Sequence, residues 1–279
     1  MSKKFFAIIG KPLSHSLSPD LHNYWFEKYK LNANYKPIEI EESQIQDVLE
    51  KIKHKNISGI NITLPYKKKI IPYLDRLIND AEKTSSVNTV YLDAENKLIG
   101  DNTDVYGMQA GYLKNFMDKN FNIKKSLVIG AGGVAPSIIV ALQKSNISDI
   151  TIINRTFDKS IFLKNKFKSI KVSKWENLLS EIVNADLVIN ATSLGLKGGK
   201  EFNLDIGPKD IKKSLIFIDT IYNPKETKMI KKLKQIGVKT FNGLEMFLYQ
   251  GQKSFYLWNK INPEIDDTLV ETLEKKIND

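Results

Sequence analysis

Three consecutive lysines close the stretch GINITLPYKKK, residues 59–69, and the spacing of Lys67 suits it to chemistry. Successive side chains of an extended chain point to opposite sides, so Asn61, Thr63 and Lys67 lie on one side. Pro65 cannot donate a hydrogen bond to a sheet, and we therefore expect the strand to end there with Lys67 at its carboxyl-terminal edge. Because open α/β sheets bind ligands at that edge, Lys67 is a candidate for proton transfer.

The opposite side of the same stretch is apolar. We expect Ile62, Leu64 and Tyr66 to anchor the strand in a core. Lys68 and Lys69 are interpreted as solvated charge.

Four further polar clusters occupy corresponding places, the last of them on the C-terminal helix. In SHSLSPD, Ser16 and Ser18 precede a proline, where hydroxyls and free backbone N–H groups suit a carboxylate. Ser18 is also expected to cap the helix that follows. SSVNTV, IGDNTD and YQGQ add Asn88, Asp104 and Gln250, and amides with hydroxyls suit a polyhydroxylated ligand.

A glycine-rich turn indicates a cofactor. LVIGAGGVAPSII places Gly130, Gly132 and Ala135 in the pattern G-x-G-x-x-A, directly after a strand and at the start of a helix. The first glycine allows the tight turn, the second lets backbone approach a pyrophosphate, and the helix start donates N–H groups to it. The context favours a dinucleotide site over a plain glycine-rich turn.

The strand that follows ends in Asn154, Arg155 and Thr156, with Lys159 one helical turn later. An NAD enzyme usually carries an acidic residue here for the ribose 2′-hydroxyl. Cationic side chains instead suit the 2′-phosphate of NADP, so we expect NADP as the cofactor.

Composition limits the number of domains and the kinds of site that this chain can contain. The 279 residues are enough for two domains. There is no cysteine for disulfide or thiolate chemistry, and His15, His22 and His54 are not spaced as metal ligands, so we expect no metal.

The net charge of +10 raises nucleic acid as a partner, but only two of the 42 basic residues are arginine. Base and phosphate recognition favours the guanidinium group, so we expect no nucleic-acid partner. We also expect no membrane segment and a cytoplasmic protein, because no apolar run is long enough to span a bilayer or to form a signal peptide.

The elements that must position these residues alternate between strand and helix. The first half reads as βαβαβ followed by a possible antiparallel hairpin, which predicts a mostly parallel sheet. We expect strands at 5–10, 33–40, 58–65, 87–93 and 97–103, and helices at 18–30 and 43–53.

A second alternation begins near Lys124, and the chain from Gly243 onward is predicted to be helical. The fold class expected is therefore α/β with two domains. We expect strands at 125–130, 149–155, 185–192 and 214–220, and helices at 134–145, 158–167 and 224–237.

Taken together, these motifs resemble shikimate dehydrogenase over nearly the whole chain. The motifs SHSLSP, NITLPYK, VNT, GDNTD, GAGGVA, NRT, NATSLG, DTIYNP and GLEMFLYQGQ appear in the family's order and spacing. The resemblance implies NADPH-dependent reduction of 3-dehydroshikimate to shikimate in aromatic amino-acid biosynthesis. It also implies a substrate domain (1–104, completed by helices 245–279), a Rossmann-type NADP domain (105–244) and an active site between them.

The resemblance also implies roles for individual residues. Lys67 and Asp104 match the catalytic pair, and an ammonium can stabilise and protonate the oxygen of a ketone that receives a hydride. The matching substrate-binding residues are Ser16, Ser18, Thr63, Lys67, Asn88, Asp104, Tyr222 and Gln250. The matching NADP-binding residues are Gly130, Ala131, Gly132, Gly133, Val134, Asn154, Arg155, Thr156 and Lys159, with Thr192, Thr220 and Gly243 at the nicotinamide end.

Two positions depart from the family pattern. Pro136 stands where a basic residue often follows the glycine loop, and Ser85 replaces a usual glycine in a turn. Alternatives that remain open are a quinate/shikimate dehydrogenase with relaxed substrate or cofactor use, a non-catalytic NADP-binding regulator, and a basic nucleic-acid binder. The oligomeric state expected is monomer or homodimer.

Overall fold

The computed structural model describes residues 3–202 and 204–278, which fold as two compact units. Unit 1 comprises the described residues of Met1–Gly107 and Leu248–Lys276, and unit 2 those of Met108–Phe247 and Ile277–Asp279. These bounds lie close to the expected domain limits. The assignment of substrate to one unit and cofactor to the other stays a prediction.

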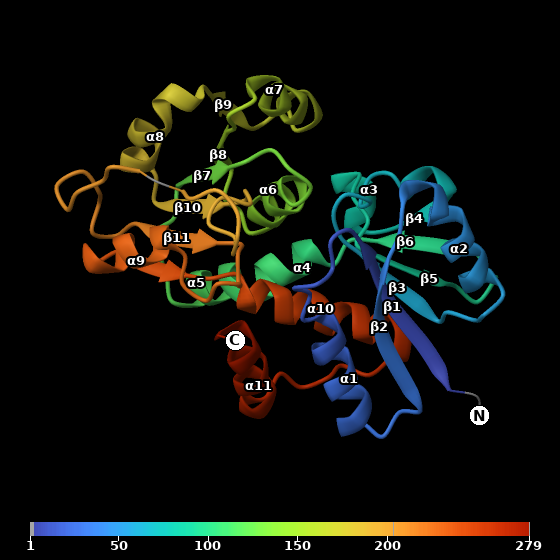
Figure 1. Cartoon of the computed structure of the whole chain (residues 1–279). Coiled ribbons are helices and arrows are strands. Elements are labelled where there is room, and N and C mark those ends of the chain that lie inside the picture. The colour runs from blue at the N-terminus through green and yellow to red at the C-terminus, as the bar shows by residue number, and fades with distance from the viewer. Residues whose placement is uncertain (1–2, 203, 279) are drawn as a thin grey trace. The chain divides into compact units, whose positions relative to one another are not determined.

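Unit 1 contains a six-stranded sheet in the order β2-β1-β3-β5-β6-β4 (Figure 1). The three strands β1, β2 and β3 are parallel, and β5 and β6 form the expected antiparallel hairpin. The βαβαβ prediction is therefore confirmed. The elements are β1 (Lys4–Gly10), α1 (Ser18–Lys28), β2 (Ala33–Glu39), α2 (Ile45–Lys53), β3 (Gly59–Ile62), β4 (Arg76–Leu77), α3 (Asp80–Thr84), β5 (Thr89–Leu92) and β6 (Leu98–Asp101), with short 3₁₀ turns η1 (Glu42–Gln44) and η2 (Ile71–Tyr73).

Strand β3 ends earlier than the sequence predicts. It stops at Ile62, and the chain then turns so that the Tyr66 N–H donates to the Thr63 carbonyl at 3.0 Å. The expectation that Leu64 faces the core is wrong, since its exposed fraction is 59%. Alternation could not hold through this turn, and Tyr66 returns to the core, where its hydroxyl donates to the Ile40 carbonyl at 2.6 Å.

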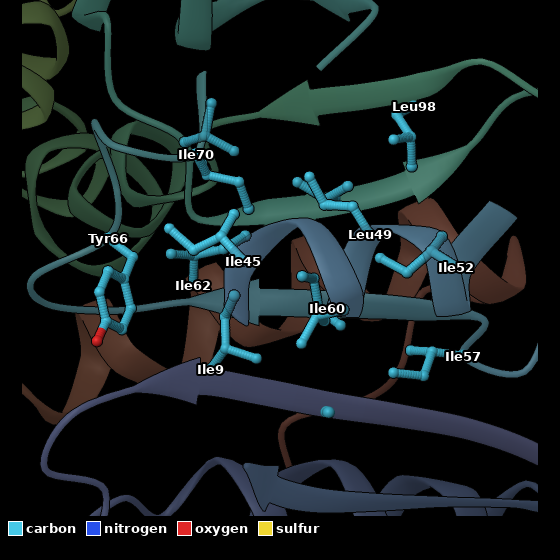
Figure 2. Close-up of a cluster of buried hydrophobic side chains, with 14 of the residues drawn as sticks. Ile9, Ile45, Leu49, Ile52, Ile57, Ile60, Ile62, Tyr66, Ile70 and Leu98 are labelled. Atoms are coloured by element: carbon cyan, nitrogen blue, oxygen red, sulfur yellow. The ribbon is translucent and has the colours of Figure 1, made fainter. Parts of the chain in front are cut away.

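The core of unit 1 fixes β3 from one side of the sheet. Figure 2 shows Ile45 and Leu49 of α2 beside Ile60 and Ile62 of β3 in one buried cluster. Burial of each such side chain stabilises the fold by about 1.5–3 kcal/mol. The turn that carries Lys67 therefore follows directly after a firmly packed strand.

Unit 2 contains a wholly parallel six-stranded sheet in the order β12-β11-β10-β7-β8-β9 (Figure 1). This is the strand order of the Rossmann fold, which confirms the predicted fold class. Strands β9 and β12 and helices α4, α5 and α8 were not predicted. The elements are α4 (Asp104–Met108, which begins in unit 1), a π-helical turn η3 (Gln109–Leu113), α5 (Lys114–Asp118), β7 (Lys125–Ile129), α6 (Ala135–Lys144), β8 (Asp149–Ile153), α7 (Phe157–Lys166), β9 (Lys171–Ser173), η4 (Trp175–Asn177), α8 (Leu178–Asn184), β10 (Leu187–Asn190), β11 (Ile216–Asp219), α9 (Lys228–Gln235) and β12 (Lys239–Phe241).

The C-terminal chain is helical, as expected, but forms two helices, α10 (Leu244–Asn259) and α11 (Asp267–Asn278). Within unit 1, α10 packs against α1, since Phe255 lies 5.4 Å from Trp25 between ring centroids. The Trp25 indole donates to the Glu264 carbonyl at 2.9 Å. Of the helices described, none is long and apolar enough to cross a membrane.

Candidate active site

Lys67 and Asp104 form an ion pair in unit 1. The Lys67 Nζ lies 2.6 Å from Asp104 Oδ2, and the exposed fractions of the two side chains are 14% and 7%. The Lys67 carbonyl accepts from the Val87 N–H at 2.8 Å, which fixes the backbone of the turn. Removing two charges from water is costly, so a pair this well buried is a candidate for a functional site.

Asn88 holds the other oxygen of the carboxylate. Its Nδ2 donates to Asp104 Oδ1 at 2.9 Å and lies 3.5 Å from Gln250 Oε1. Four predicted site residues, from the turn after β3, from the start of β5, from α4 and from α10, are thus brought together. The Asp104 carboxylate is held from both sides, by an ammonium and by an amide.

The backbone of Asp104 is fixed by its neighbour Asn102. The Asn102 Oδ1 accepts from the Asp104 N–H at 3.1 Å, and its Nδ2 donates to the Ser86 carbonyl at 2.8 Å. Asp101 precedes Asn102 in the chain. Burial raises the pKa of Asp101, while hydrogen bonds from Asn79 and from the Asn102 N–H oppose that rise.

Two buried residues that the sequence interpretation did not assign lie behind this site. Asn61 donates to the Asn88 carbonyl at 3.1 Å and to Ser254 Oγ at 3.0 Å. Ser254 also lies 3.1 Å from Thr103 Oγ1 and donates to the Gln250 carbonyl at 3.1 Å. Spacing gave one signal: Ser254 follows Gln250 by four residues, one helical turn, and therefore shares its face of α10.

Ser16 and Ser18 lie at the start of α1. The expectation that Ser18 caps this helix is wrong, because the N-cap position is Leu17 and has no side-chain cap. The Ser18 N–H instead lies 3.4 Å from Ser16 Oγ. Burial raises the pKa of Tyr35 well above its usual value, and a hydrogen bond with Ser18 opposes that rise.

The Tyr35 hydroxyl donates to Asn61 Oδ1 at 2.8 Å. Hydrogen bonds therefore connect Tyr35 to Asn61, Asn61 to the Asn88 backbone, and the Asn88 side chain to the Lys67–Asp104 pair. Side chains fixed at both ends of such a network are suited to hold a small polar ligand in one orientation.

The two remaining predicted substrate residues lie in different units. Thr63 immediately follows β3, and its N–H donates to the Ile9 carbonyl at 2.9 Å. Tyr222 belongs to unit 2, where its ring lies 4.8 Å from that of Phe247. The structure thus brings together Lys67, Asn88, Asp104 and Gln250 of unit 1, and it places Tyr222 in unit 2.

The glycine-rich turn of unit 2 fits a dinucleotide. Gly130 has a φ of +111°, and a Cβ there would lie 2.8 Å from Thr192 Cγ2, so glycine is required. A Cβ on Gly132 would meet nothing closer than the Ala191 carbonyl at 4.0 Å, which leaves open space beside exposed backbone. Helix α6 begins at Ala135, as the motif predicts.

The second predicted cofactor segment, residues 154–159, is joined to the first. Asn154 Oδ1 accepts from the Ala131 N–H at 3.1 Å, and its Nδ2 donates to the Thr156 carbonyl at 2.7 Å. The side chains of Arg155 and Lys159 are exposed beside this turn. Two exposed cations next to a bare glycine loop fit the extra phosphate of NADP.

The residues expected at the nicotinamide end lie in neighbouring loops of unit 2. A Cβ on Gly243 would lie 2.2 Å from the Thr220 carbonyl oxygen, so the two backbones are in direct contact. Gly243 also donates its N–H to the Ile221 carbonyl at 2.8 Å. Together with the Gly130–Thr192 contact, this places all three residues in loops that follow strands β10, β11 and β12.

The two departures from the family pattern are both accommodated locally. Pro136 is buried in the first turn of α6, where a missing N–H breaks no helical hydrogen bond. Ser85 takes the left-handed conformation, with φ and ψ of 47°, that the glycine would have taken. The turn before Asn88 is therefore formed, at a conformational cost.

Comparison with known proteins identifies the family. Residues 8–90 match the model for the shikimate dehydrogenase substrate binding domain, and residues 113–247 match that for shikimate / quinate 5-dehydrogenase. The chain is 47% identical to a shikimate dehydrogenase (NADP(+)) of Pelagibacter ubique, an alignment that covers 98% of this chain and 99% of that one. This chain belongs to the shikimate dehydrogenase family.

Solved shikimate dehydrogenases have the same fold. The Aquifex aeolicus structure matches at 33% identity with a TM-score of 0.83, covering 99% of this chain and 98% of that one. A Thermus thermophilus structure in complex with NADP(H) and shikimate matches at 27% identity and a TM-score of 0.83, covering 98% and 99%. The family resemblance read from the sequence is confirmed over the full length of the chain.

Proposed function

We propose that this chain is an NADP-dependent shikimate dehydrogenase that reversibly reduces 3-dehydroshikimate to shikimate. The observation that carries the proposal is the buried Lys67–Asp104 pair, 2.6 Å apart, in a chain 47% identical to a shikimate dehydrogenase (NADP(+)). A lysine exposed to solvent and without this carboxylate would not support the proposal. The pair is suited to move a proton at a ketone or alcohol oxygen.

On the substrate side, Lys67 carries the proton. Bound NADPH would supply the hydride that reduces the ketone carbon. As charge develops on the ketone oxygen, the Lys67 ammonium stabilises it and donates a proton, and in the reverse direction the amine accepts that proton. Asp104 orients the ammonium and accepts a hydrogen bond from the substrate, while Asn88 keeps that carboxylate in place.

The substrate's carboxylate and hydroxyls take the remaining polar side chains. Ser16 and Ser18 would bind the carboxylate at the start of α1, where backbone N–H groups favour an anion. Thr63, Tyr222 and Gln250 would contact hydroxyls and ring. Since each of these groups is an uncharged donor or acceptor, together they select a polyhydroxylated acid rather than an apolar one.

On the cofactor side, the backbone of the glycine loop from Gly130 to Val134 would bind the pyrophosphate. Asn154, Arg155, Thr156 and Lys159 would bind the adenosine end, with Arg155 on the 2′-phosphate. Thr192, Thr220 and Gly243 would border the nicotinamide.

The test is the rate of NADP⁺ reduction by the purified chain with shikimate, with quinate, and with NAD⁺ in place of NADP⁺. We expect turnover with shikimate and NADP⁺ to exceed that of the other combinations. Comparable rates with quinate would support the quinate/shikimate alternative. No turnover with either acid would reject the proposal in favour of a non-catalytic NADP-binding protein, a reading that the intact Lys67–Asp104 pair opposes.

We further propose that the enzyme acts in the cytoplasm as a monomer or a homodimer, with a small-molecule substrate and neither nucleic acid nor membrane as a partner. The scarcity of arginine among its basic residues supports the exclusion of nucleic acid. Among the described residues, no group of three His, Asp or Glu side chains could hold a metal ion, and proton transfer by Lys67 needs none.

A further inference from the structure

Asp219 is a fully buried carboxylate in unit 2 that the hydride-transfer chemistry does not use. It lies at the carboxyl end of β11, and its three partners are all uncharged donors. The Ile221 N–H and Asn190 Nδ2 donate to its Oδ1 at 3.1 and 3.0 Å, and Thr227 Oγ1 donates to its Oδ2 at 2.9 Å. A buried carboxylate without a cation is costly, so its presence calls for a physical reason.

Asn190, at the end of β10, extends this arrangement to the next loop. Besides its bond to Asp219, its Nδ2 lies 3.3 Å from the Leu194 carbonyl, and its Oδ1 accepts from the N–H and the hydroxyl of Thr192 at 3.1 and 2.7 Å. Its backbone carbonyl accepts from the N–H and the hydroxyl of Thr220 at 3.0 and 2.8 Å. Asn190 therefore holds Thr192 through its side-chain amide and Thr220 through its backbone carbonyl.

Asp219 also fixes two further segments, one through each carboxylate oxygen. Its bond to the Ile221 N–H holds the residue whose carbonyl accepts from Gly243, and Gly243 in turn touches the Thr220 backbone. Its bond to Thr227 holds the residue that caps helix α9. We call Asn190, Asp219 and Thr227, all buried, the Asp219 junction.

The segments that meet at the Asp219 junction are those that carry Thr192, Thr220 and Gly243. We propose that Asp219 is a positioning residue for the cofactor: through Asn190 and Ile221, which both donate to its Oδ1, it holds these three loops in the arrangement that the nicotinamide half of NADP requires. This inference rests on the proposed function, because only an NADP enzyme needs that arrangement. The adenosine half would be bound elsewhere, by the segment 154–159 after β8.

The chemistry of the junction explains why the residue is an aspartate. A carboxylate only accepts hydrogen bonds, and all three groups that face it donate. Burial raises the pKa of Asp219 to about 6, and the bonds from Ile221, Thr227 and Asn190 oppose that rise, so the group is ionised at neutral pH. An alanine would leave three donors unpaired, whereas an asparagine would keep one accepting oxygen.

The experiment compares binding of two probes by calorimetry to the whole ligand-free chain. NADPH reports on both halves of the cofactor site, and adenosine 2′,5′-bisphosphate reports on the adenosine half alone. We expect the Kd for NADPH to rise at least about tenfold in Asp219→Ala and about threefold in Asp219→Asn, with the Kd for the bisphosphate within about twofold of the parent. In turnover assays the KM for NADP⁺ should rise and that for shikimate should not.

The matched control is Thr240→Val, which removes a buried hydroxyl of unit 2 that lacks a hydrogen-bond partner and should change neither Kd. If Asp219→Ala does not fold, Asp219→Asn and Thr227→Val carry the test. An equal loss of affinity for both probes, or an unchanged Kd for NADPH alongside a lowered Tm, would assign Asp219 a merely structural role and overturn the inference. Absence of shikimate turnover in the parent chain would instead reject the proposed function, whatever the binding data.

Discussion

The surroundings of the Lys67–Asp104 ion pair distinguish Lys67 from the other lysines of the same stretch. The carboxylate contacts the ammonium through one oxygen and Asn88 through the other, and Asn88 is in turn held by Thr103. The neighbouring Lys69 is exposed and pairs with Glu42 on the surface. Two lysines two positions apart therefore have different chemical environments, and only Lys67 is largely buried beside its carboxylate.

Replacement of Lys67 tests its catalytic role. We expect Lys67→Ala to lower kcat with shikimate by at least about 100-fold, because general acid–base help is worth about 10²- to 10⁴-fold. Its Kd for NADPH should stay within about twofold of the parent, since the glycine loop lies in unit 2. Lys69→Ala is the control and should keep full activity. A kcat for Lys67→Ala within about threefold of the parent would refute the role.

His22 lowers the resistance of unit 1 to acid. Burial lowers its pKa to about 3, and the Asn61 side chain opposes that shift only in part. The unfolded chain, with a pKa near 6.5, binds a proton that the folded chain excludes, so stability is complete above about pH 6.5 and falls as pH drops toward 3.

This effect predicts a loss of about 2 kcal/mol in unfolding free energy between pH 7 and pH 5. In His22→Phe, which keeps the stacking against Tyr35 at 4.5 Å, the loss should be smaller by that amount. Urea titrations at the two pH values measure it, with the exposed His54→Gln as the control. An unchanged pH dependence in His22→Phe would show that another group is responsible.

At the scale of elements, short connections decide where the site residues lie. The turn at 63–67 carries Lys67, and the turn after α3 carries Ser85 just before Asn88. Neither is held by regular hydrogen bonding alone, so the identities of single residues matter more there than in the strands.

Ser85 is a residue in a conformation that favours glycine. Its φ of 47° costs an L-residue about 1–2 kcal/mol relative to glycine. After allowing for the greater flexibility of glycine when unfolded, we expect Ser85→Gly to stabilise the protein by about 0.5–1 kcal/mol in urea titrations. Ser180→Gly, an exposed serine inside α8, should have the opposite sign. Destabilisation by Ser85→Gly would show that the turn does not carry this strain.

Replacement of Arg155, in the turn after β8, tests whether this turn selects NADP over NAD. We expect Arg155→Ala to raise the KM for NADP⁺ at least about tenfold and to change the KM for NAD⁺ much less, because the lost contact is with the 2′-phosphate. Arg76→Ala is a matched control, since Arg76 is exposed and pairs with Asp93 in unit 1. Equal changes with the two cofactors would reject this role for Arg155.

The elements most accessible to sequence reasoning were those with long apolar periodicity or a glycine signature, such as β7 and α6. Strands β4, β9 and β12 span only two or three residues and carry no periodic pattern, so they were missed. Ser254 was missed for a different reason. Its contact with Asn61 joins residues 193 positions apart, and only the packing of α10 on unit 1 creates it.

At the scale of the whole molecule, the predicted site residues fall into two units. Unit 1 assembles Lys67, Asp104, Asn88 and Gln250, and unit 2 assembles the glycine loop with the Asp219 junction. The family resemblance was predictable because its motifs are short stretches of sequence in a fixed order and spacing. The hydrogen bonds that hold those motifs depend on tertiary packing, and the sequence order of the motifs does not reveal them.

The most direct test of this account is the appearance of NADPH when the purified chain is mixed with shikimate and NADP⁺. We predict shikimate-dependent NADPH formation that is at least about 100-fold slower in Lys67→Ala at equal protein concentration. If the parent chain forms no NADPH from shikimate, or if Lys67→Ala forms it as fast as the parent, the proposed function or its catalytic assignment is contradicted.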